Sequence, residues 1–224
     1  MVEKTKFDGI YFTYIGKRKI FLTKNLITGK SFFNERLFTE NNVEYREWVL
    51  SRSKLIAAIF NGLNIVPVKQ GSIVLYLGAA QGQTASHVSD IVGKNGFVFC
   101  VELSPRATRD LLSICEEREN MTAILADANK PESYKDNITK VDVIYQDIAQ
   151  KNQVGILLKN INLFLKPNGY ALVAIKARSI DVTKNPKEVF KEVREELEAK
   201  LKILDSKFLE PFQKDHIFFV CQKK

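Results

Sequence analysis

SIVLYLGAAQGQTASHV, residues 72–88, decides the fold, because it joins an apolar strand to a glycine-containing turn and then to a helix. A continuous apolar run of this length is typical of a strand that is buried on both faces of a parallel sheet. We therefore predict a strand at 72–77, a turn after it and a helix at 84–92.

The same alternation of strands and helices continues toward the C-terminus. Further strands are predicted at 97–103, 121–127, 141–147 and 169–177, and helices at 105–119, 153–166 and 186–201. The last two predicted strands, 202–211 and 215–222, have no helix between them and must form a hairpin. The pattern indicates an α/β fold with a Rossmann-like sheet, mostly parallel, that ends in an antiparallel C-terminal hairpin.

The first forty residues have a different pattern. Short segments at 11–16, 19–25 and 31–38 alternate apolar and polar residues, with a turn signal at 27–30. Residues 43–61 have apolar residues at helical spacing and stop at Gly62, so they are predicted to form one helix. The division predicted is a small antiparallel β domain at 1–42 and a larger domain at 43–224.

Composition excludes several classes of protein. Apolar residues make up 45% of the 224, enough for a full core and against global disorder. No apolar run reaches the roughly 18 residues needed to span a membrane, and the first residues lack the apolar region of a secretory signal. Three scattered cysteines and two histidines favour neither a disulfide framework nor a zinc site. We expect a soluble cytoplasmic protein without a metal.

The net charge of +8 is unevenly distributed. Residues 1–36 carry +5, residues 37–149 carry −3 and residues 150–224 carry +6. Basic ends around a mildly acidic middle suggest an anionic partner such as nucleic acid. A lysine-rich solvated surface would give the same count, so charge alone leaves both interpretations open.

The turn after the first core strand is a candidate ligand site. In a sheet of this type, ligands bind beyond the carboxyl ends of the strands. Gly78, Ala79, Ala80 and Gly82 are small and let a ligand approach the backbone, and the helix N-terminus that follows can hold an anion. The spacing is G-x-x-x-G, which differs from the G-x-G-x-x-G of dinucleotide enzymes. A tight connection without a ligand is the alternative.

Acidic residues end the next three core strands. Glu102 lies about 20 residues beyond the glycines, where a carboxylate can accept hydrogen bonds from ribose hydroxyls. Asp127 ends the third strand, and Ala128 after it offers a backbone N–H to an adenine edge. Asp147 ends the fourth. Together these features fit a cofactor with a sulfonium, a ribose and an adenine, namely S-adenosylmethionine, better than NAD, because nothing provides for a pyrophosphate.

Four polar residues are candidates for the chemistry of methyl transfer to oxygen. A hydroxyl nucleophile must lose its proton, and lysines whose pKa is lowered by mutual repulsion could assist, with an aspartate to orient them. Lys176 ends an apolar strand, where an unpaired charge is costly, and Asp147 is its expected partner. Lys54 and His216 complete the set. Lys54 could instead be a solvated helix lysine, and His216 a strand-edge histidine.

Several long stretches of the chain resemble fibrillarin, the RNA 2′-O-methyltransferase of box C/D guide-RNA particles. They are RSKLIAAI, VLYLGAAQGQTASHVSDIVG, VFCVELSPR, DANKPESY, VDVIYQDIAQ, VAIKARSID and PFQKDHIFFV, which span residues 52 to 220. The resemblance implies S-adenosylmethionine as cofactor, and the small N-terminal sheet as well.

The resemblance also implies roles for particular residues. A Lys-Asp-Lys-His catalytic set maps onto Lys54, Asp147, Lys176 and His216. The implied cofactor contacts are Gly78, Ala79, Ala80, Gly82, Thr84, Glu102, Leu103, Asp127, Ala128, Asp147 and Gln150. The implied RNA-binding surface runs near Arg52, Arg106 and 176–178, ending at Arg178, and would give the basic ends a purpose.

Two departures from the family bear on these expectations. The family usually has Ser and Thr where this chain has Gln81 and Gln83, which affects contacts with the amino-acid end of the cofactor. Eukaryotic members carry a Gly/Arg-rich N-terminal region that is absent here, which indicates an archaeal-type protein. The implied partners are a box C/D guide RNA with its target RNA, a Nop-domain scaffold protein and a kink-turn-binding protein of ribosomal type.

Three other functions remain open on sequence alone. The chain could be a ribonucleoprotein scaffold subunit with a vestigial cofactor pocket, although it keeps all four candidate catalytic residues. A protein methyltransferase could use the same pocket, although basic ends favour RNA as the substrate. A nicotinamide dehydrogenase lacks the expected glycine spacing.

Overall fold

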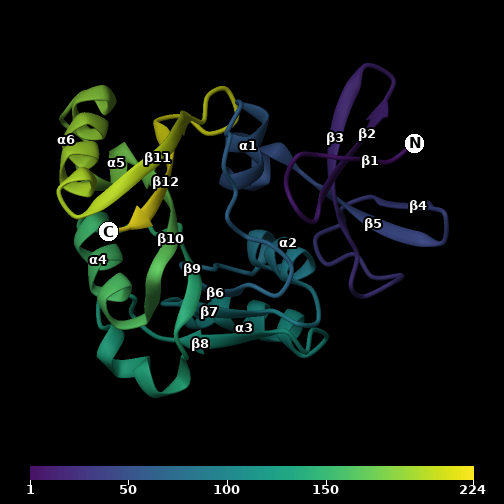
Figure 1. Ribbon diagram of the computed structural model, residues 1–224, viewed down its shortest axis with the longest axis horizontal. Coiled ribbons are helices and arrows are strands. Elements are labelled where there is room, and N and C mark those ends of the chain that lie inside the picture. Colours follow the sequence, from purple (N-terminus) through teal and green to yellow (C-terminus); the bar gives the residue numbers. More distant parts are fainter.

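The computed structural model describes residues 1–224. The larger part of the protein is built on a seven-stranded sheet (Figure 1). The strand order is β11-β12-β10-β9-β6-β7-β8. The strands are β6 (Ile73–Leu77), β7 (Phe97–Glu102), β8 (Met121–Leu125), β9 (Val141–Gln146), β10 (Leu165–Lys176), β11 (Leu201–Phe208) and β12 (His216–Lys223).

One strand of this sheet runs against the others. The pairs β6–β7, β7–β8, β6–β9 and β9–β10 are parallel, whereas β12 is antiparallel to both β10 and β11. The prediction of a mostly parallel Rossmann-like sheet with an antiparallel C-terminal hairpin is confirmed. The carboxyl ends of β6 to β10 therefore meet at one edge of the sheet.

Helices cover both faces of the larger sheet, because its strands are apolar on both sides. Val74 and Tyr76 of β6 belong to one core and the alternate residues Leu75 and Leu77 to another. The first core is completed by α1 (Lys54–Phe60), α2 (Gln83–Val92) and α3 (Pro105–Cys115), and the second by α4 (Gln153–Phe164) and α6 (Pro186–Glu198). Two short helices that we did not predict are η2 (Pro131–Asn137) and α5 (Ala177–Ile180).

The N-terminal residues form a separate antiparallel sheet of five strands, which Figure 1 shows in purple and blue. Its order is β1-β2-β3-β5-β4, with β1 (Glu3–Lys4), β2 (Ile10–Ile15), β3 (Arg18–Lys24), β4 (Leu37–Glu40) and β5 (Val43–Trp48). A small antiparallel β-sheet was predicted here and is confirmed. The strand predicted at 31–38 begins only at Leu37.

The helix predicted over residues 43–61 is wrong in its first half. Residues 43–48 form β5, which pairs with β3 on one side and β4 on the other, and a short helix η1 (Leu50–Arg52) separates it from α1. The apolar spacing of residues 43–48 fits the period of a helix and also that of a strand. The segment forms a strand because it is hydrogen-bonded to two neighbouring strands. The N-terminal sheet therefore reaches Trp48, beyond the boundary expected at residue 42.

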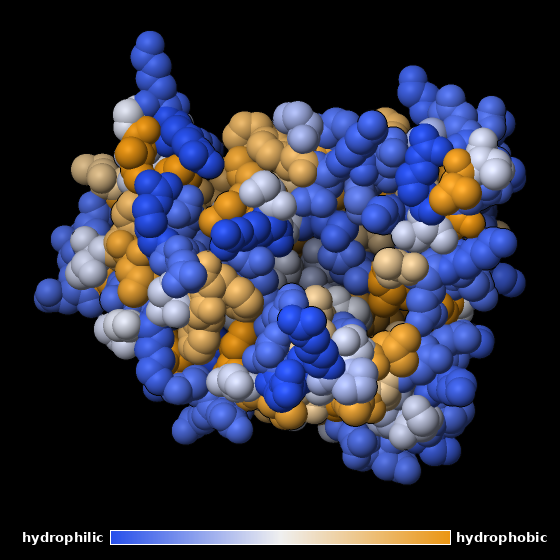
Figure 2. Space-filling view, turned by 180° about the vertical axis from the view of Figure 1, so that it is seen from behind, coloured by the Kyte–Doolittle hydropathy of each residue, from blue (hydrophilic) through white to orange (hydrophobic).

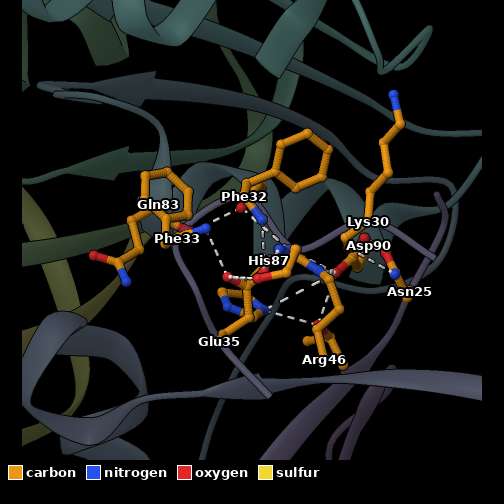
Figure 3. A network of polar contacts seen from close by, with 12 residues as sticks. Asn25, Lys30, Phe32, Phe33, Glu35, Arg46, Gln83, His87 and Asp90 are labelled. Carbon is orange, nitrogen blue, oxygen red and sulfur yellow. Dashed lines mark hydrogen bonds and ion pairs between the residues drawn. The ribbon is translucent and has the colours of Figure 1, made fainter. Parts of the chain in front are cut away.

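A buried ionic network joins the small sheet to the larger domain (Figure 3). The fully buried guanidinium of Arg46 in β5 donates to Asp90 of α2 at 2.9 Å and to Glu35 at 2.6 Å. Arg118, after α3, donates to the other oxygen of Asp90 at 2.8 Å, and the Thr23 hydroxyl donates to Asp90 at 2.8 Å. Buried charges require such pairing, so the network ties β3 and β5 to α2.

His87 lies at the centre of this junction. Its ring stacks on Trp48 with centroids 4.9 Å apart, and its Nδ1 lies 2.8 Å from the Thr23 hydroxyl. That hydroxyl gives its own proton to Asp90, so His87 Nδ1 donates to Thr23. Burial, followed by the charges of Arg46 and Arg118, holds the pKa of His87 well below its usual value. His87 is therefore a neutral structural residue.

The surface shows no membrane-spanning element. No helix is both long enough and apolar enough to cross a bilayer. Hydrophilic residues dominate the face shown in Figure 2, and apolar residues lie on it in separate patches. The three cysteines are unpaired, and no group of histidine, cysteine or acidic residues is arranged to hold a metal ion.

Replacement of Asp90 by Asn tests the ionic junction. The change leaves two buried arginines without their shared carboxylate, so the free energy of unfolding is expected to fall by about 3–5 kcal/mol. Urea denaturation measures this loss. The control is Glu192→Gln, which breaks an exposed ion pair with Lys184 and is expected to cost less than about 1 kcal/mol. An Asp90→Asn protein as stable as the control would contradict the account.

Acid is expected to destabilise the protein through His87. Below about pH 6.5 this histidine binds a proton in the unfolded chain but stays neutral in the folded protein. The contribution of His87 to the free energy of unfolding is therefore fully present above that pH. It is lost as the pH drops, by at most about 1.4 kcal/mol per pH unit. Urea denaturation at pH 7.0 and 5.5 measures the difference. In His87→Gln the pH dependence should shrink, and His216, whose pKa is also lowered, should supply part of the remainder. An unchanged dependence would refute the assignment.

Candidate functional site

A cavity of about 370 Å³ opens beyond the carboxyl ends of β6, β7, β8 and β9. Seven residues predicted to contact the cofactor line it: Gly78, Ala80, Glu102, Leu103, Ala128, Asp147 and Gln150. Val101, Ala126, Ile148 and Ala149 complete an apolar wall. The sheet therefore gathers residues that are far apart in the sequence into one pocket, as the positions at the strand ends predict.

Glu102 is held at the mouth of this cavity by two backbone donors. Its Oε2 accepts from the N–H of Ala80 and its Oε1 from the N–H of Ser104, both at 2.8 Å. A carboxylate has about four acceptor positions, so each oxygen can accept one more hydrogen bond. The side chain is thus fixed in position and still able to bind a pair of hydroxyl groups.

Asp127 and Ala128 form the turn after β8. One oxygen of Asp127 accepts from the N–H of Asn129 at 2.9 Å and from the Gln150 amide at 3.4 Å. The carbonyl of Ala128 accepts from Asn160, whereas its N–H has no acceptor in the protein. This N–H is a free donor at the cavity wall. Asp127 is not among the residues that line the cavity, but it accepts a hydrogen bond from Gln150, which does line it.

Both glycines of the turn are required by close packing, and Gly78 also lines the cavity. A Cβ at Gly78 would collide with the backbone carbonyl of Asp147, so glycine lets the turn after β6 lie against the end of β9. Gly82 has φ of 91°, and a Cβ there would lie 2.6 Å from Leu111 of α3. Gly82 does not line the cavity, and Ala79 beside it is buried. Their placement is explained by packing alone.

A cluster of charged and titratable residues adjoins the cavity. Lys54, the first residue of α1, places its Nζ 2.9 Å from Oδ2 of Asp147, and both side chains are about one-fifth exposed. Asp147 also lines the cavity. Lys176 at the end of β10 pairs in register with His216 at the start of β12. The four candidate catalytic residues thus converge from four separate elements.

His216 is oriented by a backbone carbonyl. Its Nδ1 lies 2.6 Å from the carbonyl oxygen of Lys214, which can only accept, so Nδ1 carries the proton and Nε2 is the basic nitrogen. Burial is the main cause that lowers the pKa of His216, with contributions from the charges of Lys54 and Lys176, while the Lys214 carbonyl and Asp147 act in the opposite direction. The imidazole is therefore held neutral with Nε2 available.

The ion pair in this cluster differs from the expected one. Asp147 was expected to pair with Lys176, the lysine of the neighbouring strand, and two lysines were expected to repel one another. Its partner in the structure is Lys54, from a helix 93 residues away in the sequence. Lys176 is exposed at the strand end, without an ion pair. The sequence shows which strands are adjacent but does not show which helix lies over their ends.

The three arginines that were predicted to contact RNA differ in the contacts that they make within the protein. Arg106 is exposed near the start of α3. Arg52 donates to the carbonyl of Phe33, and Arg178 is paired with Asp215 at 3.2 Å and donates to the carbonyl of Val182. Arg106 is free for an anionic partner, and the other two are already oriented by local contacts.

Two glutamines that we did not predict lie directly beneath the cluster. Gln146 precedes Asp147 and is fully buried, and its amide donates to the carbonyl of Gln153 at 2.8 Å. The Gln153 amide in turn approaches the carbonyl of Lys176 at 3.4 Å. The signal in the sequence was a polar residue inside the apolar run VDVIYQ. These amides link the backbone ends of β9, α4 and β10.

Thr84, which was predicted to contact the cofactor, is not among the residues that line the cavity. It is the second residue of α2, and it is almost completely buried. Its hydroxyl donates to Ser53 at 2.9 Å, next to Lys54. Gln81 and Gln83 line a different, open depression of about 420 Å³ with Phe32 and Phe33.

Comparison with curated proteins gives close relatives over the whole chain. The family model for fibrillarin matches residues 1–224. A relative from Thermococcus onnurineus, named fibrillarin-like rRNA/tRNA 2′-O-methyltransferase, is 52% identical over 225 residues, with 99% of each chain covered.

Solved structures show the same similarity. The fibrillarin pre-rRNA processing protein of Methanococcus jannaschii is 49% identical with a TM-score of 0.95, covering 100% of this chain and 97% of that one. Aeropyrum pernix fibrillarin with natively bound S-adenosyl-L-methionine is 44% identical with a TM-score of 0.91, covering 99% and 97%. A fibrillarin/Nop5p complex contains a chain 44% identical with a TM-score of 0.85, covering 92% and 94%.

These matches extend over both sheets, and the resemblance inferred from the motifs is confirmed. With the family model covering every residue, this chain belongs to the fibrillarin family.

Proposed function

We propose that this chain is an S-adenosylmethionine-dependent RNA 2′-O-methyltransferase that acts as the catalytic subunit of a box C/D guide ribonucleoprotein. One observation carries the proposal. Asp147 lines the cavity at the sheet edge and is also ion-paired with Lys54. The cavity for a methyl donor and the polar cluster that could act on a hydroxyl therefore share one side chain.

The cavity residues fit S-adenosylmethionine. Glu102 has acceptor positions left for ribose hydroxyls, and the free N–H of Ala128 can donate to an adenine edge. The apolar wall suits a flat base, and a carboxylate on the wall suits a cationic sulfonium. Gln150 is held by Asp127 at the same wall. Nothing in the lining calls for a pyrophosphate-binding loop.

The chain's own residues supply the acid–base chemistry. When bound, S-adenosylmethionine supplies an electrophilic methyl group. Nε2 of neutral His216 accepts the proton of a ribose 2′-hydroxyl, while the Lys54 and Lys176 ammonium groups stabilise the negative charge that develops on that oxygen. Asp147 holds Lys54 in place. Positioning of the hydroxyl against the donor supplies much of the rate enhancement.

The proposed partners follow from charge and from the relatives. The chain carries a net charge of +8, with the excess in its two ends, which suits the phosphate backbone of RNA. A family member forms a complex with Nop5p, and we propose an equivalent Nop-domain scaffold here. A guide RNA with its target and a kink-turn-binding protein complete the proposed particle. Arg52, Arg106 and Arg178 are the proposed RNA contacts, and the cytoplasm is the proposed location.

A methylation assay tests this function directly. The chain is combined with a guide RNA, a matched target RNA and the partner proteins, and transfer of a labelled methyl group from S-adenosylmethionine is followed. The label is expected at the guided ribose and to depend on the guide. A label in protein instead of RNA would show that the chain is a protein methyltransferase. Cofactor binding without any transfer would indicate a scaffold role.

Lys176→Ala is expected to abolish transfer while cofactor affinity stays nearly intact. Lys176 lies at the reacting edge but does not line the cavity, so its loss removes charge stabilisation at the nucleophile, about 10²- to 10⁴-fold in rate. Single-turnover assays and calorimetry with S-adenosylmethionine measure the two effects. Lys191→Ala, at an exposed position of α6, is the control. Transfer at the normal rate in the Lys176 variant would refute its catalytic role.

The rate of transfer is expected to depend on the protonation of His216. Since the pKa of His216 lies below its usual value of about 6.5, the basic form is present at neutral pH and the rate should fall only at a pH below that value. A pH–rate profile of the assembled particle checks this. His216→Gln should be slow at every pH and should lose this acid limb. A limb that persists unchanged in the variant would assign the titration to another group.

A further inference from the structure

The N-terminus of α1 lacks the local capping that its sequence offers. Ser53 is the residue before Lys54, it has extended backbone angles, and it is almost completely buried. A serine at this position commonly accepts a hydrogen bond from a backbone N–H in the first turn of its helix. The hydroxyl of Ser53 makes no such bond and accepts from the Thr84 hydroxyl at 2.9 Å.

Thr84 connects this helix to the turn that borders the cavity. It lies two residues after Gly82, in the first turn of α2, and that turn follows the cavity residues Gly78 and Ala80. The hydrogen bond between Thr84 and Ser53 therefore spans two helices, and it joins the segment that borders the cavity to the segment that carries Lys54. Both hydroxyls are buried, where water does not compete for them.

A stacked pair of buried aromatic rings lies on the two strands that lead to the cavity. Tyr76 of β6 and Tyr145 of β9 are buried with ring centroids 4.3 Å apart. The strands of these tyrosines run directly into Gly78 and Asp147.

Two other hydrogen bonds also hold the segment that carries Lys54. The Gln213 amide donates to the carbonyl of Ser51 at 2.6 Å, and Arg52 donates to the carbonyl of Phe33 at 3.0 Å. Helix α1 has only seven residues and no acidic residue in its first turn. Its residues 55–59 are buried and fix how deeply the helix sits, but they are apolar and give no direction to its N-terminus. Among these hydrogen bonds, the one at Ser53 joins the start of α1 to α2.

We propose that the Ser53–Thr84 hydrogen bond positions Lys54 against Asp147 relative to the cofactor cavity, so that Thr84 is a positioning residue for methyl transfer. The inference rests on the proposed function for its catalytic consequence. It assigns Thr84 a role different from the cofactor contact that the resemblance implies. The observation behind this role is the hydrogen bond from the Thr84 hydroxyl to Ser53.

Three variants in the assembled particle test the pair. Thr84→Val removes the hydroxyl and keeps the shape, Ser53→Ala removes its partner, and Thr84→Ser keeps the hydroxyl. In the first two, kcat is expected to fall roughly 10- to 100-fold, because small displacements of a catalytic group are costly. The Kd for S-adenosylmethionine should stay within about twofold, since the cavity is intact. Thr84→Ser should retain the normal rate, and combining the first two changes should add little.

Thr108→Val is the matched control. Thr108 is also a buried threonine near a helix start, and its hydroxyl donates to the carbonyl of Ser104 at 2.9 Å without reaching α1. Its loss is expected to leave kcat unchanged. Weaker binding of S-adenosylmethionine by Thr84→Val with an unchanged kcat would overturn the proposal in favour of a cofactor contact. An unchanged kcat in both Thr84→Val and Ser53→Ala would overturn it as well.

A crystal structure of Thr84→Val gives a test that does not depend on activity. The separation of Lys54 Nζ and Asp147 Oδ2, 2.9 Å in the native chain, should lengthen or the lysine should become disordered. An unchanged ion pair would overturn the proposal. If the native particle transfers no methyl group, the proposed function fails, whereas this separation still decides whether the hydroxyl pair positions Lys54. Should Thr84→Val not fold, the same measurement is made on Ser53→Ala.

Discussion

The carboxylate of Asp90 bridges two guanidinium groups that have no access to water, and Glu35 beside Arg46 supplies the second negative charge. Arg46 comes from the small sheet and Arg118 from the loop after α3, and both are fully buried. An unpaired charge at this depth is far more costly than an exposed one, so these side chains must stay together for the chain to fold. Because the partners come from different parts of the chain, this requirement also fixes how the N-terminal sheet packs on α2.

The position of α2 matters because both halves of the candidate site depend on it. Its N-terminus continues from the turn that borders the cavity, and that turn is fastened to Glu102 through the N–H of Ala80. Thr84 in its first turn is bonded to Ser53, next to Lys54. Asp90, two turns further along the helix, is held by the small sheet. The N-terminal sheet, which has no catalytic candidates of its own, thereby stabilises α2. The cavity turn and Lys54 are both attached to that helix.

Much of this could be predicted from sequence, and the exceptions share a cause. The apolar strands and the acids at their ends identified the sheet and its reactive edge, because local pattern and topology suffice for both. The strand at 43–48 was missed because two neighbouring strands, and not its own periodicity, determine its structure. We predicted Lys176 as the ion-pair partner of Asp147, whereas the partner is Lys54, because this pairing depends on where α1 lies. The close packing of Gly82 on Leu111 of α3 could not be predicted, because it depends on where α3 lies.

The reversed direction of β12 completes the cluster. Strands β6 to β10 bring their carboxyl ends to the edge where the cavity lies, and β12 would contribute its last residues there if it ran in the same direction. Since β12 runs the other way, it contributes its first residue, and the register places His216 directly opposite Lys176. The Lys214 carbonyl, in the loop just before the strand, is then near enough to orient the imidazole. A parallel β12 would have brought Lys223 to this edge, adding a third lysine where the chemistry needs a neutral base.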